Sequence, residues 1–148
     1  MNNTENTKFS KVFESTCEED TEQFAYEFAD LLQKGDFIAF FGDLGSGKTA
    51  FTRGVAKKIC PSCRVSSPTF AIVNEYEGGK IPIFHFDMYR ICDDDNLYST
   101  GFYDYFDRNG IIITEWSENI PFALPQERYD VVFEKTGDNQ RKITITKK

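Results

Sequence analysis

One segment constrains the fold of this 148-residue chain more than any other feature. Residues 42–49 read Gly-Asp-Leu-Gly-Ser-Gly-Lys-Thr and fit the pattern G-x-x-x-x-G-K-[ST] at every fixed position. The continuous apolar run of residues 37–41 precedes it, as is typical of a strand buried on both faces of a parallel sheet. Residues 49–59 follow with a helical pattern that Pro61 closes. The sequence therefore predicts a strand, a glycine-rich turn and a helix, in that order.

This arrangement is suited to binding phosphate. Glycines let the backbone wrap around an anion, so that successive N–H groups and the helix N-terminus point at a β-phosphate. Lys48 is expected to add a positive charge between the β and γ oxygens, and the Thr49 hydroxyl is expected to ligate Mg²⁺. The alternative is a glycine-rich turn with an exposed lysine. With glycine at about 7% of residues, a chain of this length would match the pattern by accident only roughly once in 200.

Two acidic residues follow predicted strands. Residues 81–86 lead into Asp87, and residues 111–114 lead into Glu115. Besides Thr49, a bound Mg²⁺ needs an acidic residue to hold or orient it. With two acids available, one can hold the metal, and the other can hold the metal as well or orient the attacking water. Strands often end in a solvated carboxylate, so spacing alone leaves the role of each acid open.

The remaining elements complete an α/β fold. They are a helix over residues 18–34 that starts at a Thr16-x-x-Glu19 capping box and stops at Gly35, a hairpin of residues 70–76 and 81–86, a short helix within residues 97–106 around Gly101, and a closing hairpin of residues 129–135 and 142–146. We predict a three-layer P-loop NTPase fold with a mixed, partly parallel sheet and antiparallel hairpins. Residues 1–148 are expected to form a single domain, with residues 1–8 loose.

The charge balance restricts the partners. The formal net charge is −7, from 17 basic and 24 acidic residues, so the surface lacks the Lys/Arg–phosphate contacts that dominate nucleic-acid affinity. We therefore do not expect tight, direct RNA binding. The chain has no apolar run long enough to span a membrane and no secretory signal at its start, so we expect no membrane association and a cytoplasmic location.

The four cysteines are too few for a disulfide framework. Cys60 and Cys63 form a CxxC pair that is open to a redox role or to half of a zinc site. A zinc site needs a second ligand pair, and the only histidine, His85, lies inside a strand-like run. Structural or incidental thiols are therefore the favoured interpretation.

A serine-rich loop lies between the predicted helix and the first hairpin. Pro68 stiffens residues 66–70 and biases Ser67 away from helical conformation, which leaves hydroxyl groups exposed on an ordered loop. Such a loop is suited to sensing a γ-phosphate, as switch segments do. An ordinary turn before a strand explains the same residues.

Together the motifs resemble one family. These are GDLGSGKTAFTRG at residues 42–54, SPTF at 67–70, HFDMYR at 85–90, GFYDYF at 101–106 and TEWSE at 114–118. In order and spacing they are similar to the TsaE family, formerly YjeE, the bacterial ATPases needed for threonylcarbamoyladenosine modification at tRNA position 37. The resemblance covers about residues 12–146. It implies ATP with Mg²⁺ as ligand, slow hydrolysis that depends on partners, and work alongside TsaD and TsaB, with tRNA met only indirectly.

The resemblance also implies roles for individual residues. The family's phosphate contacts are matched by Leu44, Gly45, Ser46, Gly47, Lys48 and Thr49, and its Mg²⁺ ligand is also matched by Thr49. Glu115 matches the metal-binding and catalytic acid, and Asp87 matches the Walker-B-like acid. Thr69 matches the switch-loop threonine, and Thr16 and Glu18 match the residues on the adenine side. The departures are Ser46, where alanine is common, and Met88, where leucine is common. Trp116, beside Glu115, is open to a core role or to coupling the site to a partner surface.

Two other function classes share the phosphate motif. A small-molecule kinase would need an acceptor pocket and a lid with arginines near the transferred phosphoryl group, and the sequence has no such arginine cluster. A nucleotide-gated binding module would need no turnover. Asp87 and Glu115 favour chemistry, so a partner-dependent ATPase is the first hypothesis.

Overall fold

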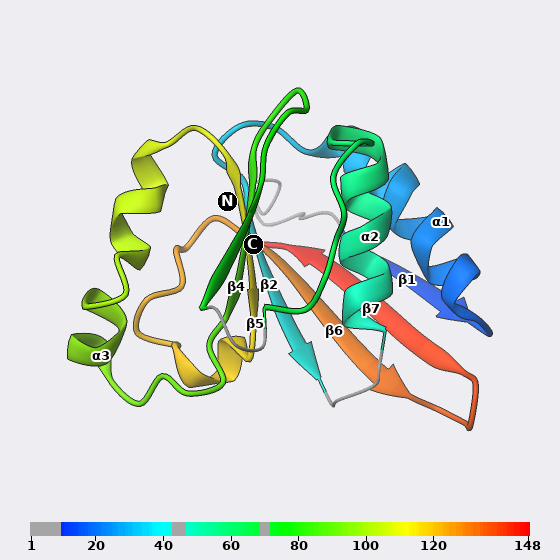
Figure 1. The fold of residues 1–148 in the computed structure, drawn as a ribbon. Coiled ribbons are helices and arrows are strands. Elements are labelled where there is room, and N and C mark those ends of the chain that lie inside the picture. Colours follow the sequence, from blue (N-terminus) through cyan, green and yellow to red (C-terminus); the bar gives the residue numbers. More distant parts are fainter. Residues whose placement is uncertain (1–9, 43–46, 69–71) are drawn as a thin grey trace, which may run out of the picture.

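A computed structural model describes residues 10–42, 47–68 and 72–148. Within these residues, seven strands form one sheet in the order β1-β7-β6-β2-β5-β4-β3 (Figure 1). The strands are β1 Ser10–Ser15, β2 Phe37–Gly42, β3 Val73–Tyr76, β4 Ile83–Asp87, β5 Ile111–Glu115, β6 Tyr129–Lys135 and β7 Arg141–Lys147. The helices are α1 Glu18–Phe28, α2 Lys48–Ile59 and α3 Asp94–Tyr98, with 3₁₀ helices η2 Ala29–Leu31, η3 Phe102–Asp107 and η4 Ser117–Asn119. The predicted α/β class with a mixed sheet is confirmed.

The centre of the sheet is parallel. β2 pairs in parallel with β5 on one side and β6 on the other, and β4 pairs in parallel with β5. Every residue of β5 is buried, as expected of a strand covered on both faces. In the β4–β5 register Asp87 lies opposite Glu115, so both acids stand at the same edge of the sheet.

Antiparallel pairs extend both sides of this centre. β3 pairs with β4 and β6 pairs with β7, so both predicted hairpins are confirmed. β3 begins only at Val73, and residues 69–71 of the predicted strand lie outside the described residues. β1 was not predicted. It pairs with β7 along its whole length, and its outward Val12 is 54% exposed, so a hydrophobic pattern gives no sign of it.

Helices cover both faces of the sheet (Figure 1). α1 and α2 pack on one face, where Phe51 of α2 contacts Phe40 and Phe133 of the sheet at ring-centroid distances of 5.4 and 5.7 Å. A second buried cluster, which includes Phe37, Phe86 and Phe102, lies beneath α3 and η3. The continuous apolar strands are thus explained by two covered faces.

The predicted first helix is wrong in two details. The α-helix ends at Phe28 and continues as η2 to Leu31, short of residue 34. The Thr16–Glu19 capping box does not form, because the carboxylate of Asp20 instead accepts hydrogen bonds from the Thr16 N–H and hydroxyl at 3.1 and 2.9 Å. The N-cap residue of α1 is Cys17, which makes no side-chain capping hydrogen bond, so Asp20 holds the residue before this N-cap in place of a capping box.

The predicted helix within residues 97–106 is two shorter helices. α3 begins earlier, at Asp94, and η3 follows from Phe102 to Asp107. Gly101 separates them with φ of +84°, a conformation that favours glycine. Among the described residues, none of the helices combines the length and apolar character needed to span a membrane.

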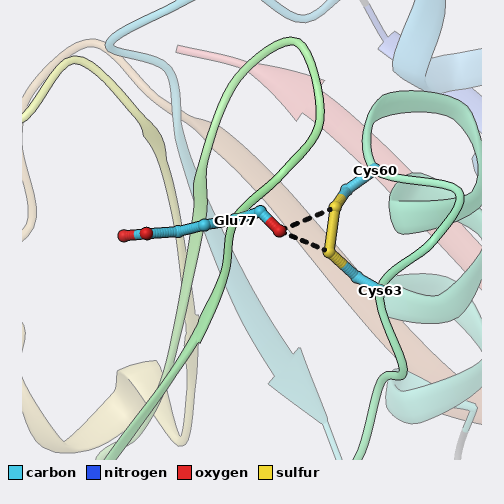
Figure 2. The surroundings of a disulfide bond; sticks show 3 residues. All are labelled: Cys60, Cys63 and Glu77. Carbon is cyan, nitrogen blue, oxygen red and sulfur yellow. Dashed lines mark hydrogen bonds between the residues drawn. A yellow bond between two sulfur atoms is a disulfide. The ribbon is translucent and has the colours of Figure 1, made fainter.

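A disulfide closes the end of α2. Cys60 and Cys63 are bonded, which corrects the expectation of free thiols (Figure 2). Their sulfur atoms lie 3.5 and 3.3 Å from the carbonyl oxygen of Glu77, in the β3–β4 turn. The Lys80 N–H in the same turn donates to the Ile59 carbonyl at 3.1 Å. The hairpin is therefore docked on the C-terminal end of α2.

Candidate functional site

A cavity of about 630 Å³ opens at the N-terminus of α2. It is lined by Thr16, Cys17, Glu18, Thr21, Gly47, Lys48, Thr49, Ala50, Arg53, Ser67, Glu115, Asn139 and Arg141. The structure thus brings six of the predicted site residues to one cavity: Thr16, Glu18, Gly47, Lys48, Thr49 and Glu115. Leu44, Gly45, Ser46 and Thr69 lie outside the described residues. Asp87 is described but does not line the cavity.

The glycine-rich turn has a glycine on each side, Gly42 and Gly47, and both have backbone conformations that favour glycine. Gly47 directly precedes α2 as its N-cap, with φ of +106°, and Gly42 ends β2 with φ of +130°. A Cβ on Gly42 would lie 2.3 Å from the carbonyl oxygen of Phe133 on β6. The strand therefore enters the turn, and the helix leaves it, in conformations that other residues rarely adopt.

Lys48 holds its charge at the end of β2. The side chain is buried, and Nζ donates to the Gly42 carbonyl at 2.5 Å. The ammonium also lies 5.4 Å from the centre of the Trp116 ring, within the range of a cation–π contact. The charge is thus placed where the turn begins, beside the strand ends that carry the acids.

The two acids occupy different environments. Glu115 is 8% exposed, and its Oε2 lies 2.6 Å from Nε2 of His85. Asp87 is half-buried, and its Oδ1 accepts the Tyr89 N–H at 2.9 Å. Burial raises the pKa of Asp87, and the nearby charge of Glu115 adds to this, against the lowering effect of the Tyr89 N–H and of Lys48.

A strained turn carries the residues after Glu115. Trp116 has φ of +59°, uncommon for any residue other than glycine and a conformation that costs free energy. Ser117 stabilises the turn through hydrogen bonds of its hydroxyl to Thr114, at 2.7 Å to the hydroxyl and 3.0 Å to the carbonyl. Trp116 is half-buried, and its ring packs at a tilt of 57° against the Tyr89 ring, with the ring centroids 4.9 Å apart. The turn thereby places an aromatic ring over the lysine and directs Glu115 into the cavity.

Several cavity residues escaped the sequence analysis. Asn139 and Arg141 come from the β6–β7 hairpin, which the parallel pairing of β6 with β2 places beside the site. Arg53 projects from α2 and is paired with Glu22 of α1 at 2.6 Å. No local motif marks Asn139 or Arg141, and Arg53 lies within the quoted motif of residues 42–54 but was assigned no role there. His85 is fully buried against Glu115. The one sequence feature that marks it is that the only histidine of the chain lies inside an apolar strand.

The donor chemistry around the cavity fits Mg²⁺ better than a structural metal. Thr49, Glu115 and Asp87 offer oxygen atoms, the ligands that Mg²⁺ prefers. Among the described residues, no group of three or more His, Cys, Asp or Glu side chains could hold an ion alone. Mg²⁺ usually binds through one or two carboxylates together with substrate phosphates, so a site built this way needs no protein cage.

Comparisons with known proteins agree on one family. The curated relatives include two proteins named "tRNA threonylcarbamoyladenosine biosynthesis protein TsaE". The one from Bacillus subtilis (strain 168) is 40% identical over 128 residues, which is 86% of this chain and 80% of that protein. The one from Aquifex aeolicus (strain VF5) is 38% identical over 135 residues, 88% and 92% of the two chains.

A solved structure and a family model point the same way. A crystal structure of YdiB from Bacillus subtilis superposes with a TM-score of 0.78 at 33% identity, covering 95% of this chain and 87% of that one. The family model described as "Threonylcarbamoyl adenosine biosynthesis protein TsaE" matches residues 15–143. Because the family model, the curated relatives and the solved structure all agree over most of its length, this chain belongs to the TsaE family.

Proposed function

We propose that this protein is a P-loop ATPase that acts as an accessory subunit in N6-threonylcarbamoyladenosine modification of tRNA. The observation that carries the proposal is the meeting of Lys48, Thr49 and Glu115 in one cavity at the N-terminus of α2, with Asp87 in register beside Glu115. Membership of the TsaE family supports the pathway. The fold proposed is the three-layer P-loop NTPase fold, and residues 1–148 are proposed to act as one domain.

The chain's residues divide the work on ATP. The N–H groups of residues 44–49 and the N-terminus of α2 bind the phosphates, and Lys48 neutralises charge on them. Thr49, Glu115 and Asp87 would hold Mg²⁺, which when bound stabilises charge that develops on the transferred phosphoryl group. Glu115 also orients the attacking water, and Thr69 senses the γ-phosphate. Thr16 and Glu18, which line the cavity, would face the adenine ring.

The partners follow from charge and family. At −7 the chain is poorly suited to gripping tRNA, so it is proposed to dock on TsaD and TsaB, which meet the tRNA. The cytoplasmic location stays a prediction.

The decisive experiment measures ATP hydrolysis by the purified chain with and without the TsaB–TsaD pair. We expect slow turnover alone and faster turnover with the pair. The same reaction with small-molecule acceptors tests the kinase alternative, in which phosphate would move to the acceptor. No hydrolysis in either condition, with nucleotide still bound, would favour a nucleotide-gated binding module and overturn the ATPase proposal.

A further inference from the structure

A buried chain of polar groups leads away from Glu115. Oε2 of Glu115 lies 2.6 Å from Nε2 of His85, and Nδ1 of the same ring lies 3.2 Å from the Tyr76 hydroxyl. That hydroxyl donates to the Ser66 carbonyl at 2.9 Å and accepts the Ser66 N–H at 3.3 Å. His85 is 0% exposed and Tyr76 is 6% exposed, so water does not compete along the middle of the chain.

This path of hydrogen-bonded groups crosses three neighbouring strands. Glu115 ends β5, His85 lies on β4, and Tyr76 ends β3. From β3 it reaches the loop after α2, where Ser66 is followed by Ser67. Because Glu115 and Ser67 both line the cavity, the hydrogen-bonded path connects two walls of the same site through the interior of the protein.

The position of His85 does not call for a polar residue on packing grounds. Its neighbours on the same face of the sheet, Ile83 two residues earlier on β4 and Ile113 opposite it on β5, are fully buried and apolar. A buried polar ring is costly unless its nitrogens are hydrogen-bonded. Here both nitrogens have partners, and both partners belong to the path between the acid and the loop.

We propose that His85 is a positioning residue, an inference that rests on the proposed function. Through Nε2 it fixes the carboxylate of Glu115, and through Tyr76 it fixes the backbone of Ser66. The acid and the loop that carries Ser67 therefore adopt their working positions together. A change at either wall is transmitted to the other without passing through the cavity.

The first test compares variants of the full chain in the ATPase assay with TsaB–TsaD. His85→Asn is too short to reach Glu115 and is expected to lower kcat about 10-fold, while ADP affinity changes by less than about threefold. His85→Gln, whose amide can approach the Nε2 position, is expected to restore part of kcat. Equal kcat for wild type and His85→Asn, or equal losses in both His85 variants, would overturn the proposal.

Tyr76→Phe tests the second half of the hydrogen-bonded path, from His85 to Ser66. It is expected to lower kcat by about threefold, and the double variant with His85→Asn is expected to be no slower than His85→Asn alone, because the path is already broken. Tyr105→Phe is the matched control. It removes a hydroxyl that bonds Glu75 at 2.7 Å, away from the path, and should leave kcat unchanged. Additive losses in the double variant would contradict a single connected path.

A second readout does not depend on catalysis. The Ser66 N–H donates to Tyr76, so its hydrogen exchange reports the far end of the chain. We expect faster exchange in residues 64–68 of both Tyr76→Phe and His85→Asn, and unchanged exchange in Tyr105→Phe. Wild-type exchange in His85→Asn would overturn the inference even if the protein hydrolyses no ATP. Absent hydrolysis with the expected exchange pattern would count against the proposed function alone.

Discussion

Glu115 and Asp87 show how two carboxylates at one sheet edge can differ. Glu115 is buried and bonded to a histidine, whereas Asp87 is half-buried and bonded to a backbone N–H. The sequence predicted both as site residues because each follows an apolar strand. Their separate environments could not be predicted, because these depend on which residues the neighbouring strands place opposite them.

We predict that Glu115→Gln lowers kcat by about 100-fold or more, because the amide can neither ligate Mg²⁺ as a carboxylate does nor accept a proton from water. ADP affinity should change only a few-fold. Steady-state hydrolysis and a direct binding assay measure the two effects. Glu134→Gln, an exposed acid at the end of β6, is the matched control. Unchanged turnover in Glu115→Gln would move the catalytic role to Asp87.

Asp87→Asn should raise stability at neutral pH while lowering activity. Because the pKa of Asp87 is raised, the folded protein holds that proton more tightly than the unfolded chain does. Wild-type stability therefore falls as pH rises from the ordinary value of 3.8 through the raised pKa. The variant lacks this loss, so its Tm should exceed the wild-type Tm at neutral pH and the difference should vanish in acid. A difference independent of pH would contradict the assignment.

At the scale of elements, α1 and α2 approach each other unusually closely. A Cβ on Gly54 of α2 would lie 2.3 Å from the backbone carbonyl oxygen of Glu22 on α1. Glycine at this position allows α1 to lie against α2, and the start of α1 supplies Thr16 and Glu18 to the cavity. A glycine inside a helix is thus explained by packing.

Gly54→Ala should destabilise the protein. Alanine favours a helix by about 1 kcal/mol over glycine, but overpacking against a backbone atom costs about 1–3 kcal/mol or more, so the clash prevails. Urea unfolding measures the net loss. Gly137→Ala is the control, because its nearest neighbour is the flexible end of Gln140, and it should stay within about 0.5 kcal/mol of wild type. A Gly54→Ala protein more stable than wild type would contradict the close packing.

Sequence patterns were strongest where an element is stabilised by its own residues. The apolar runs of β2 and β5 and the hairpins were predicted because burial and turn chemistry are local signals. β1 was missed because its pairing with β7 stabilises it, and a partner 126 or more residues along the chain leaves no local mark. Asn139 and Arg141 were missed for a similar reason, since the pairing of β6 with the distant β2 brings their hairpin to the site.

At the scale of the whole molecule, nucleotide binding should be visible as stability. A ligand that binds only the folded state at 100 times its Kd adds about 2.7 kcal/mol. For a chain of this size each kcal/mol raises Tm by about 2–4 °C. We therefore expect ADP or ATP with Mg²⁺ to raise Tm by about 5–10 °C.

Lys48→Ala is the control for that measurement. It removes the charge that the fold holds at the end of β2, so the Tm shift should be largely lost at the same nucleotide concentration. Equal shifts in wild type and Lys48→Ala would rule out the phosphate cradle. A fluorescent-nucleotide titration of both proteins checks the affinities directly.

Trp116 is the only tryptophan in the chain. Its ring lies 5.4 Å from the Lys48 ammonium and 4.9 Å from the Tyr89 ring, one residue beyond Glu115. Indole emission responds to nearby charge and to polar surroundings, so the emission of the whole protein reports on this one place. The protein thus carries an intrinsic optical probe of site occupancy, and binding and release can be followed in real time without attaching a dye.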